Sequence, residues 1–252
     1  MKPETISDQP NRNVVILAEH EDITITWSRF SPGERGPDLH VHHEHTDAFY
    51  VLDGELTFEL GPQAEATSVG PGGFVAVPAN VPHSFVNASN GEARWLNFHA
   101  PECGFADFLR TLRAGAPGQW DSFDAPADGG LPASEAIVSA PGEGERLVTG
   151  SRVVLLKSDL LELCVAEWEL DGPYDGPPLH RHDRQVDSFY VLEGELEMTV
   201  GGAIQTAGPG TLASVPRGVR HTFNHRAEGK TRVVNIHAPD AGFAGVLRRM
   251  AD

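Results

Sequence analysis

Two clusters of histidine and aspartate have the residue types and the spacing that a metal site needs. His40 and His42 are separated by one residue, so on a β-strand both side chains leave the same face. Asp47 follows five residues later, and His83 lies further along the chain, after Pro78. Imidazole nitrogen together with carboxylate oxygen suits a divalent transition metal such as iron, manganese, nickel, copper or zinc. We expect these side chains to bind one metal ion.

The same set of side chains occurs a second time, as His180, His182, Asp187 and His221. The surrounding sequence repeats as well: PDLHVHHEHTDAFYVLDGE from Pro37 is matched by PPLHRHDRQVDSFYVLEGE from Pro177. Two further pairs of blocks follow in the same order, from Gly72 and Gly210 and from Leu96 and Val234. A single buried histidine is more often a hydrogen-bonded core residue than a metal ligand. Retention of the whole set in both copies favours metal binding in at least one copy, with up to one ion per domain.

The repeat predicts two copies of one domain joined by a linker. Residues 115–133 are rich in proline and glycine, Pro117 among them, and have no hydrophobic periodicity. We place the boundary near residue 125, which gives an N-terminal domain over residues 1–125 and a C-terminal domain over residues 126–252.

Most segments of each copy are predicted to be short β-strands. Residues 22–30 alternate between apolar and polar side chains, and Asp53-Gly54 between two apolar runs indicates a hairpin, as does Glu193-Gly194. Each copy ends in a segment with apolar residues at helical spacing, Phe105 to Leu112 and Phe243 to Met250. The pattern favours an all-β fold of two tandem jelly-roll β-barrels, each followed by a short α-helix.

The order of these residues resembles the cupin superfamily, and the two copies resemble a bicupin of the quercetinase-like kind. The resembling motifs are His-x-His followed by an acid, and then Gly-x5-Pro-x-Gly-x2-His-x3-Asn, and the resemblance covers residues 14 to 250. It implies a metal held inside each barrel by three histidines and an acid. The ligands it implies are His40, His42, Asp47, His83, His180, His182, Asp187 and His221.

The chain departs from the cupin pattern at several positions. The acid is Asp47 and Asp187 where the family usually has glutamate, so the carboxylate reaches less far and could bind directly, through water or not at all. The first copy has Asn80 where Gly218 stands in the second. Asparagine tolerates a positive φ nearly as well as glycine, so we expect this change to be mild.

Several further side chains near these motifs are candidates for a role in chemistry. His43 and His45 are expected to face solvent if the strand that carries His40 continues. His99 and His237 end matching strands, where they could act as proton carriers in the cavity or could cap the strand end.

Two further pairs of residues could have either a structural or a functional role. Tyr50 and Tyr190 follow the acid by three residues and could line the cavity, although aromatic residues on such strands usually belong to the core. Arg217 and Arg220 flank His221 and could bind an anionic substrate, although surface salt bridges are the commoner role for such arginines.

Composition narrows the class of partner. The 252 residues include 19 Lys and Arg against 36 Asp and Glu, for a net charge of −17, which disfavours nucleic acid and anionic membranes. The two cysteines, Cys103 and Cys164, make no disulfide framework, and we expect a reducing, cytoplasmic location. A small-molecule substrate is the expected partner, and a homodimer is possible.

Resemblance to bicupins implies metal-dependent oxidative cleavage of a small aromatic or enolisable compound by a dioxygenase-like enzyme. Two alternatives stay open. The first is a non-redox metal-dependent isomerase or decarboxylase, and the second is a small-molecule-binding cupin without catalysis. One fold serves many chemistries, so the fold does not separate them.

Overall fold

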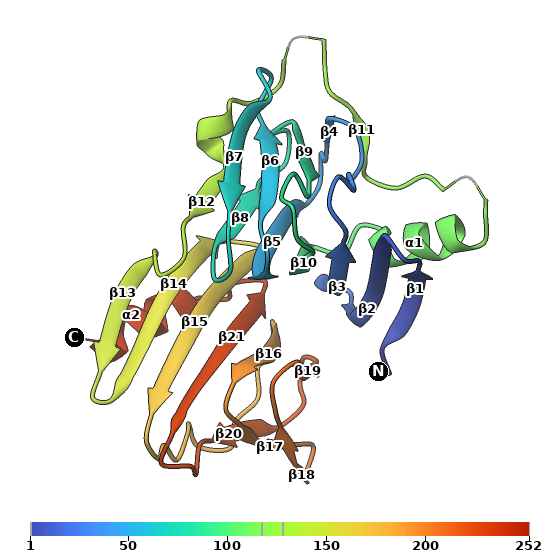
Figure 1. The fold of residues 1–252 in the computed structure, drawn as a ribbon. Coiled ribbons are helices and arrows are strands. Elements are labelled where there is room, and N and C mark those ends of the chain that lie inside the picture. The colour runs from blue at the N-terminus through green and yellow to red at the C-terminus, as the bar shows by residue number, and fades with distance from the viewer. Residues whose placement is uncertain (1, 117, 128, 252) are drawn as a thin grey trace. The chain divides into compact units, whose positions relative to one another are not determined.

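The computed structural model describes residues 2–116, 118–127 and 129–251, and the chain forms two compact units, Met1–Gly142 and Glu143–Asp252 (Figure 1). Both units are built from antiparallel strands, as the all-β prediction requires. Neither helix in the described ranges has the length and apolar composition of a membrane span.

The first unit has two sheets. The larger sheet has the strand order β1-β2-β3-β10-β5-β8-β12 and the smaller has the order β11-β4-β9-β6-β7. The strands are β1 (Glu4–Asp8), β2 (Arg12–His20), β3 (Ile23–Phe30), β4 (His40–Val41), β5 (Thr46–Asp53), β6 (Leu56–Leu60), β7 (Glu65–Val69), β8 (Phe74–Val77), β9 (His83–Val86), β10 (Ala93–Ala100), β11 (Phe123–Asp124) and β12 (Ile137–Ser139).

The second unit repeats this arrangement with sheets ordered β13-β14-β15-β21-β16-β19 and β18-β17-β20. Its strands are β13 (Glu145–Thr149), β14 (Arg152–Leu160), β15 (Leu163–Asp171), β16 (Val186–Glu193), β17 (Leu196–Val200), β18 (Ala203–Ala207), β19 (Leu212–Val215), β20 (His221–Asn224) and β21 (Lys230–Ala238). The tandem jelly-roll prediction is therefore confirmed.

The alternation of side chains along each strand places one row inside its barrel. On β5, Phe49 and Val51 join Phe58 and Trp95 in the core of the first unit, and Asp47 lies on the same face two residues before Phe49. Turn chemistry fixes the register: Gly54, between β5 and β6, has a φ of 71°, and a Cβ there would meet the carbonyl oxygen of Glu92 at 2.0 Å.

A short helix follows the last long strand of each unit, as predicted. They are α1 (Phe105–Arg113) and α2 (Phe243–Ala251). Glu102 accepts hydrogen bonds from the amides of Gly104 and Ala106 at the start of α1, and Asp240 serves the amides of Phe243 and Ala244 at the start of α2. Ala106 and Leu109 pack on Ile16 of β2, so α1 belongs to the first unit.

The connection between the two copies belongs largely to the first unit. β11 pairs with β4, and β12 pairs with β8 beyond the 3-10 turn η1 (Ala133–Glu135). The compact unit therefore extends to Gly142, whereas composition places the boundary near residue 125. The pairing of β11 and β12 could not be predicted from composition, because a segment this rich in proline and glycine has the composition of a linker. Pro117, part of the predicted linker, lies outside the described residues.

Candidate metal centres

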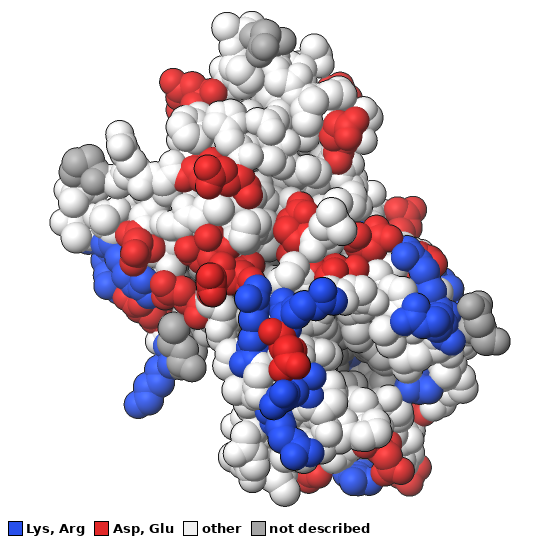
Figure 2. Space-filling view, turned by 180° about the vertical axis from the view of Figure 1, so that it is seen from behind, with Lys and Arg blue, Asp and Glu red and all other residues white. Residues whose placement is uncertain are grey.

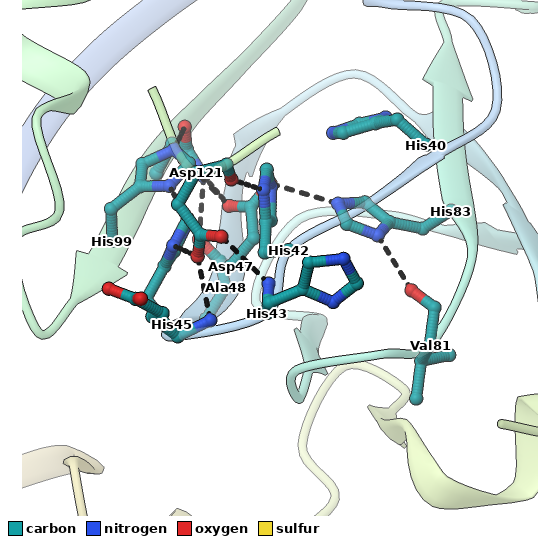
Figure 3. Close-up of polar contacts among 12 residues, drawn as sticks. His40, His42, His43, His45, Asp47, Ala48, Val81, His83, His99 and Asp121 are labelled. Carbon is teal, nitrogen blue, oxygen red and sulfur yellow. Dashed lines mark hydrogen bonds and ion pairs between the residues drawn. The ribbon is translucent and has the colours of Figure 1, made fainter. Parts of the chain in front are cut away.

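Three imidazoles of the first unit converge at one end of its smaller sheet (Figure 3). His40 on β4 is paired in register with His83 on β9, and His42 follows β4 directly. The ring centroids lie 4.3 Å apart for His40 and His83, 4.8 Å for His40 and His42, and 5.0 Å for His42 and His83. All three side chains are buried, with exposed fractions of 7% or less.

Backbone carbonyls fix which ring nitrogen of these imidazoles carries the hydrogen. Nδ1 of His40 donates to the carbonyl of Asp38 at 2.9 Å, and Nδ1 of His83 donates to that of Val81 at 3.0 Å. Nδ1 of His42 donates to the carbonyl of Asp121 at 2.5 Å. A carbonyl only accepts, so each neutral ring keeps its lone pair on Nε2, the arrangement typical of metal-binding histidines.

The carboxylate of Asp47 faces these lone pairs. Its Oδ2 lies 3.3 Å from Nε2 of His83 and 3.9 Å from Nε2 of His42, while its Oδ1 accepts a hydrogen bond of 2.5 Å from Nδ2 of Asn97. Nε2 of His42 is buried and has no hydrogen-bond partner among the described residues. Several acceptors thus converge with no hydrogen between them, and a cation at this position would satisfy them together.

The second unit reproduces this geometry. Nδ1 of His180 and of His221 donate to the carbonyls of Pro178 and Val219, and Asp187 Oδ2 lies 3.1 Å from His221 Nε2 and 3.4 Å from His182 Nε2. Asn235 donates to the other oxygen of Asp187 at 2.7 Å, as Asn97 does to Asp47. Nε2 of His182 is also buried without a partner in the described ranges. His180 and His182 are partly exposed, in contrast to His40 and His42.

The pKa shifts of His40, His180 and both aspartates favour the ligand forms of these groups, whereas that of His221 does not. Burial, with the neighbouring imidazoles, lowers the pKa of His40 to about 3, and burial lowers the pKa of His180. Burial alone raises the pKa of Asp47 and Asp187, but the surrounding histidines outweigh it and hold both well below the usual range. Burial lowers the pKa of His221, but the hydrogen bonds to Asp187 and to the Val219 carbonyl, together with the Asp187 charge, outweigh it and raise the pKa. An ionised carboxylate beside neutral imidazoles is the form that binds divalent metals.

His99, a candidate proton carrier, lies beside Asp47 in a chain of hydrogen bonds. Asp121 Oδ2 contacts His45 Nδ1 at 2.7 Å, His45 Nε2 contacts His99 Nδ1 at 2.9 Å, and His99 Nε2 contacts Asn97 Oδ1 at 3.0 Å (Figure 3). Burial lowers the pKa of His99 well below its usual range. Two neutral imidazoles supply two N–H groups for these three contacts, so one contact lacks a hydrogen while both rings are neutral, and a third proton would fill it.

The expectation for His45 was wrong, and that for His43 is confirmed. His43 is exposed, but His45 has an exposed fraction of only 2% and stacks on His42 with ring centroids 4.0 Å apart. The strand ends at Val41, and a bend at His43 and Glu44 returns His45 to the side of His42. Alternation along a strand does not hold through a bend, and the amides of this bend donate to the carboxylate of Asp121, which is distant in sequence.

In the second unit Gln185 stands where the first has His45. Gln185 Nε2 donates to His237 Nδ1 at 2.6 Å, and His237 Nε2 contacts Asn235 Oδ1 at 3.1 Å. A single neutral imidazole satisfies both contacts. Burial lowers the pKa of His237 to about 4. Both His99 and His237 are therefore brought to the candidate metal ligands, but only His99 continues into a second imidazole and a carboxylate.

The other candidates lie away from this geometry. Tyr50 and Tyr190 are buried, but each stands three residues after the aspartate, on the opposite face of its strand, and Tyr50 places its hydroxyl near Gly72. Arg217 and Arg220 are exposed in the turn before His221. Asn80 has a φ of 68° and Gly218 a φ of 78°, so asparagine does take the place of glycine in this turn.

A pocket of about 230 Å³ opens onto the histidines of the first unit. Its walls include His40, His42 and Asp47 together with His99. Six aromatic residues also line it: Phe30, Phe85, Trp95, Phe105, Phe108 and Trp120. An apolar pocket with a few convergent polar groups is the usual form of a small-molecule site.

The residues present fit a metal ion in each unit. Five imidazoles present Nε2 lone pairs fixed by backbone carbonyls, and a hydrogen-bonded carboxylate completes each set. In the second unit one ligand atom from each of His180, His182, Asp187 and His221 lies within 4.8 Å of the others; in the first this holds for His40, His42 and His83. These His and Asp groups could hold a divalent cation.

Comparisons with known proteins agree with this architecture. A family model for the Cupin domain matches residues 26–99 and 168–237, more than half of the chain. Quercetin 2,3-dioxygenase of Bacillus subtilis (strain 168) is 24% identical over 260 residues, which covers 85% of this chain and 72% of that protein.

Solved structures with a similar fold include AerE from Microcystis aeruginosa, with a TM-score of 0.62 and 14% identity over 94% of this chain and 96% of that one. The formate complex of Lactobacillus farciminis oxalate decarboxylase has a TM-score of 0.62 and 12% identity, over 94% of this chain and 84% of its own. At these identities the likeness concerns the fold. With the Cupin domain matched in each half, the chain belongs to the cupin family and is a bicupin.

Proposed function

We propose that this bicupin is a metal-dependent enzyme that binds one divalent transition metal in each unit. The ligands are His40, His42, His83 and Asp47 in the first unit, and His180, His182, His221 and Asp187 in the second. The observation that supports this most directly is the convergence of imidazole Nε2 atoms on one carboxylate in each unit, with Nε2 of His42 and of His182 buried without a hydrogen-bond partner among the described residues.

We further propose that the reaction is oxygenase-like and acts on a small aromatic or enolisable compound. A bound transition metal would polarise substrate oxygens and, if redox-active, would activate dioxygen. Aromatic side chains line much of the pocket, and His99, whose Nε2 lies 3.5 Å from Asp47 Oδ1, is the group to which we assign uptake of a proton from a substrate hydroxyl. The distant relative quercetin 2,3-dioxygenase supports this choice of reaction. Both cysteines are free, which suits the cytoplasmic location that we propose.

Metal content is the first test. We expect the purified protein, or protein loaded with Fe²⁺, Mn²⁺, Ni²⁺, Cu²⁺ or Zn²⁺ and desalted, to hold up to two equivalents by elemental analysis. The double variant His40→Ala with His180→Ala should lose most of this metal. His43→Ala is the matched control, because His43 is exposed beside the same site. Unchanged metal content in the double variant would contradict the proposal.

The reaction class needs a separate measurement. Metal-loaded protein should consume oxygen with catechols, diketones or flavonols in an oxygen electrode, and the double variant should not. If metal is bound and no oxygen is consumed, the oxygenase assignment is wrong. Metal-dependent isomerisation, decarboxylation or binding without catalysis would then account for the site.

A further inference from the structure

At one cross-strand pair inside each barrel, the large and the small side chain have changed places between the two units. In the first unit Ser28 on β3 is paired with Trp95 on β10, and in the second Trp168 on β15 is paired with Val233 on β21. The indole therefore comes from a different strand in each copy. This exchange changes where each barrel interior is filled.

The enclosed space differs accordingly. Ser28 lines the pocket of about 230 Å³ in the first unit, beside Phe30, Phe85 and Trp95. Trp168 lies among the counterparts of those residues, Leu170, Phe223 and Val233, and they line a void of only about 10 Å³. Trp168 is 7% exposed, and its indole nitrogen has no hydrogen-bond partner among the described residues. The second barrel is thus filled where the first is open.

A segment of the connection forms a further wall of the open pocket. The ring of Trp120 lies 4.9 Å from that of His42, 4.9 Å from that of Phe105 and 5.2 Å from that of Phe108. Asp121 fixes this segment, because its carboxylate accepts hydrogen bonds from the amides of His43 and Glu44. Trp120 is held by residues that adjoin the metal ligands.

We propose that this pocket in the first unit binds a substrate with a single aromatic ring, seated between Trp120 and the space left by Ser28 with its oxygens toward His40, His42 and Asp47. The inference rests on the proposed function, since the metal would receive those oxygens. An apolar cavity of about 150 Å³ holds benzene, so about 230 Å³ suits one ring with a few substituents and is small for a multi-ring flavonol. Aromatic walls favour a ring by stacked and edge contacts.

The test uses full-length protein loaded with Zn²⁺, which binds without redox turnover, and catechol as the probe. Calorimetric titration should show catechol binding that is at least tenfold weaker in Trp120→Ala and in Ser28→Trp, with zinc content unchanged in both. Trp168→Phe is the matched control in the second unit and should bind catechol as the parent protein does. Quercetin should bind at least tenfold more weakly than catechol.

The outcomes separate the two proposals. Trp120 is only partly buried, so its variant remains informative if Ser28→Trp fails to fold. Zinc bound with parental catechol affinity in Trp120→Ala, or quercetin bound as tightly as catechol, would overturn the inference. Catechol binding by a protein that takes up no metal would overturn the proposed function and leave the pocket assignment standing.

Discussion

Asn97 and Asn235 show how much of each candidate metal centre depends on residues that do not themselves face the metal. Each amide donates to one oxygen of the neighbouring aspartate and to a backbone carbonyl, which leaves the second aspartate oxygen toward the imidazoles. Since aspartate reaches less far than glutamate, its orientation decides whether it can serve as a ligand. We infer that the two asparagines position the carboxylates.

Replacing one asparagine should weaken one metal centre alone. We expect Asn97→Leu, which keeps the approximate volume, to reduce the zinc affinity of the first unit by about 10- to 100-fold, the usual effect of losing such an outer partner. Competition with a chromophoric chelator should then resolve one tight and one weak equivalent. Asn235→Leu is the matched change in the second unit. Two equivalents of parental affinity in either variant would show that the asparagine does not orient the carboxylate.

Buried histidine should make the metal-free protein less stable in mild acid. Burial lowers the pKa of His237 to about 4, whereas its ordinary value is 6.5. Between these values the unfolded chain binds a proton that the folded chain does not, so the free energy of unfolding falls by about 1.4 kcal/mol per pH unit from this residue as the pH is lowered. Above pH 6.5 the residue contributes no pH dependence.

Urea unfolding of chelator-treated protein at several pH values between 5 and 7 tests this expectation. His237→Asn should flatten the dependence below pH 6.5 by about that slope, whatever its effect on stability at neutral pH. The exposed residue His43, changed to asparagine, serves as the control. Parallel curves for His237→Asn and the parent protein would mean that His237 titrates normally in the fold.

At the scale of elements, the carboxylate of Asp121 ties the segment that carries β11 to the bend after β4, in addition to the pairing of β11 with β4. Asp121 is 8% exposed and accepts hydrogen bonds from the amides of His43 and Glu44 and contacts His45. Those donors lie in the bend that follows β4, so the bend and the connection stabilise each other. The position of Trp120 beside the pocket depends on this link.

Asp121→Ala should leave three donors without their acceptor and loosen the bend. We expect a local cost of about 1–3 kcal/mol, seen as faster hydrogen exchange of the amides of His43 and Glu44. Asp124→Ala removes an exposed carboxylate from the same segment and is the control. If exchange at these two amides is the same in both variants, another contact holds the bend.

For the whole molecule, repetition made the architecture predictable. Two matched copies, alternating strands and a closing helical face predicted tandem barrels, and the structure has them (Figure 1). Acidic side chains are scattered over the face seen in Figure 2, in keeping with the net charge of −17. The spacing of the histidines and aspartates also brought both candidate ligand sets together, because it reflects strand register.

The remaining features depend on contacts between segments distant in sequence. The bend that buries His45 needs Asp121, and the difference between the barrel interiors needs the pairing of Ser28 with Trp95 and of Trp168 with Val233. No pattern within a short stretch of sequence indicates either of these contacts. A side chain's neighbour across the sheet is visible only when the register is known.

The pairing of β12 with β8 determines where the chain can be cut if the first unit is to be produced alone. β8 would be an edge strand without β12, because its other neighbour is β5. A first barrel cut at residue 125 would present a row of unpaired amides and carbonyls on Phe74–Val77, four buried residues with apolar side chains. Such an exposed edge is a template for aggregation between copies. By pairing with β8, β12 thus prevents association through this edge. A separately produced N-terminal half should therefore extend through Gly142.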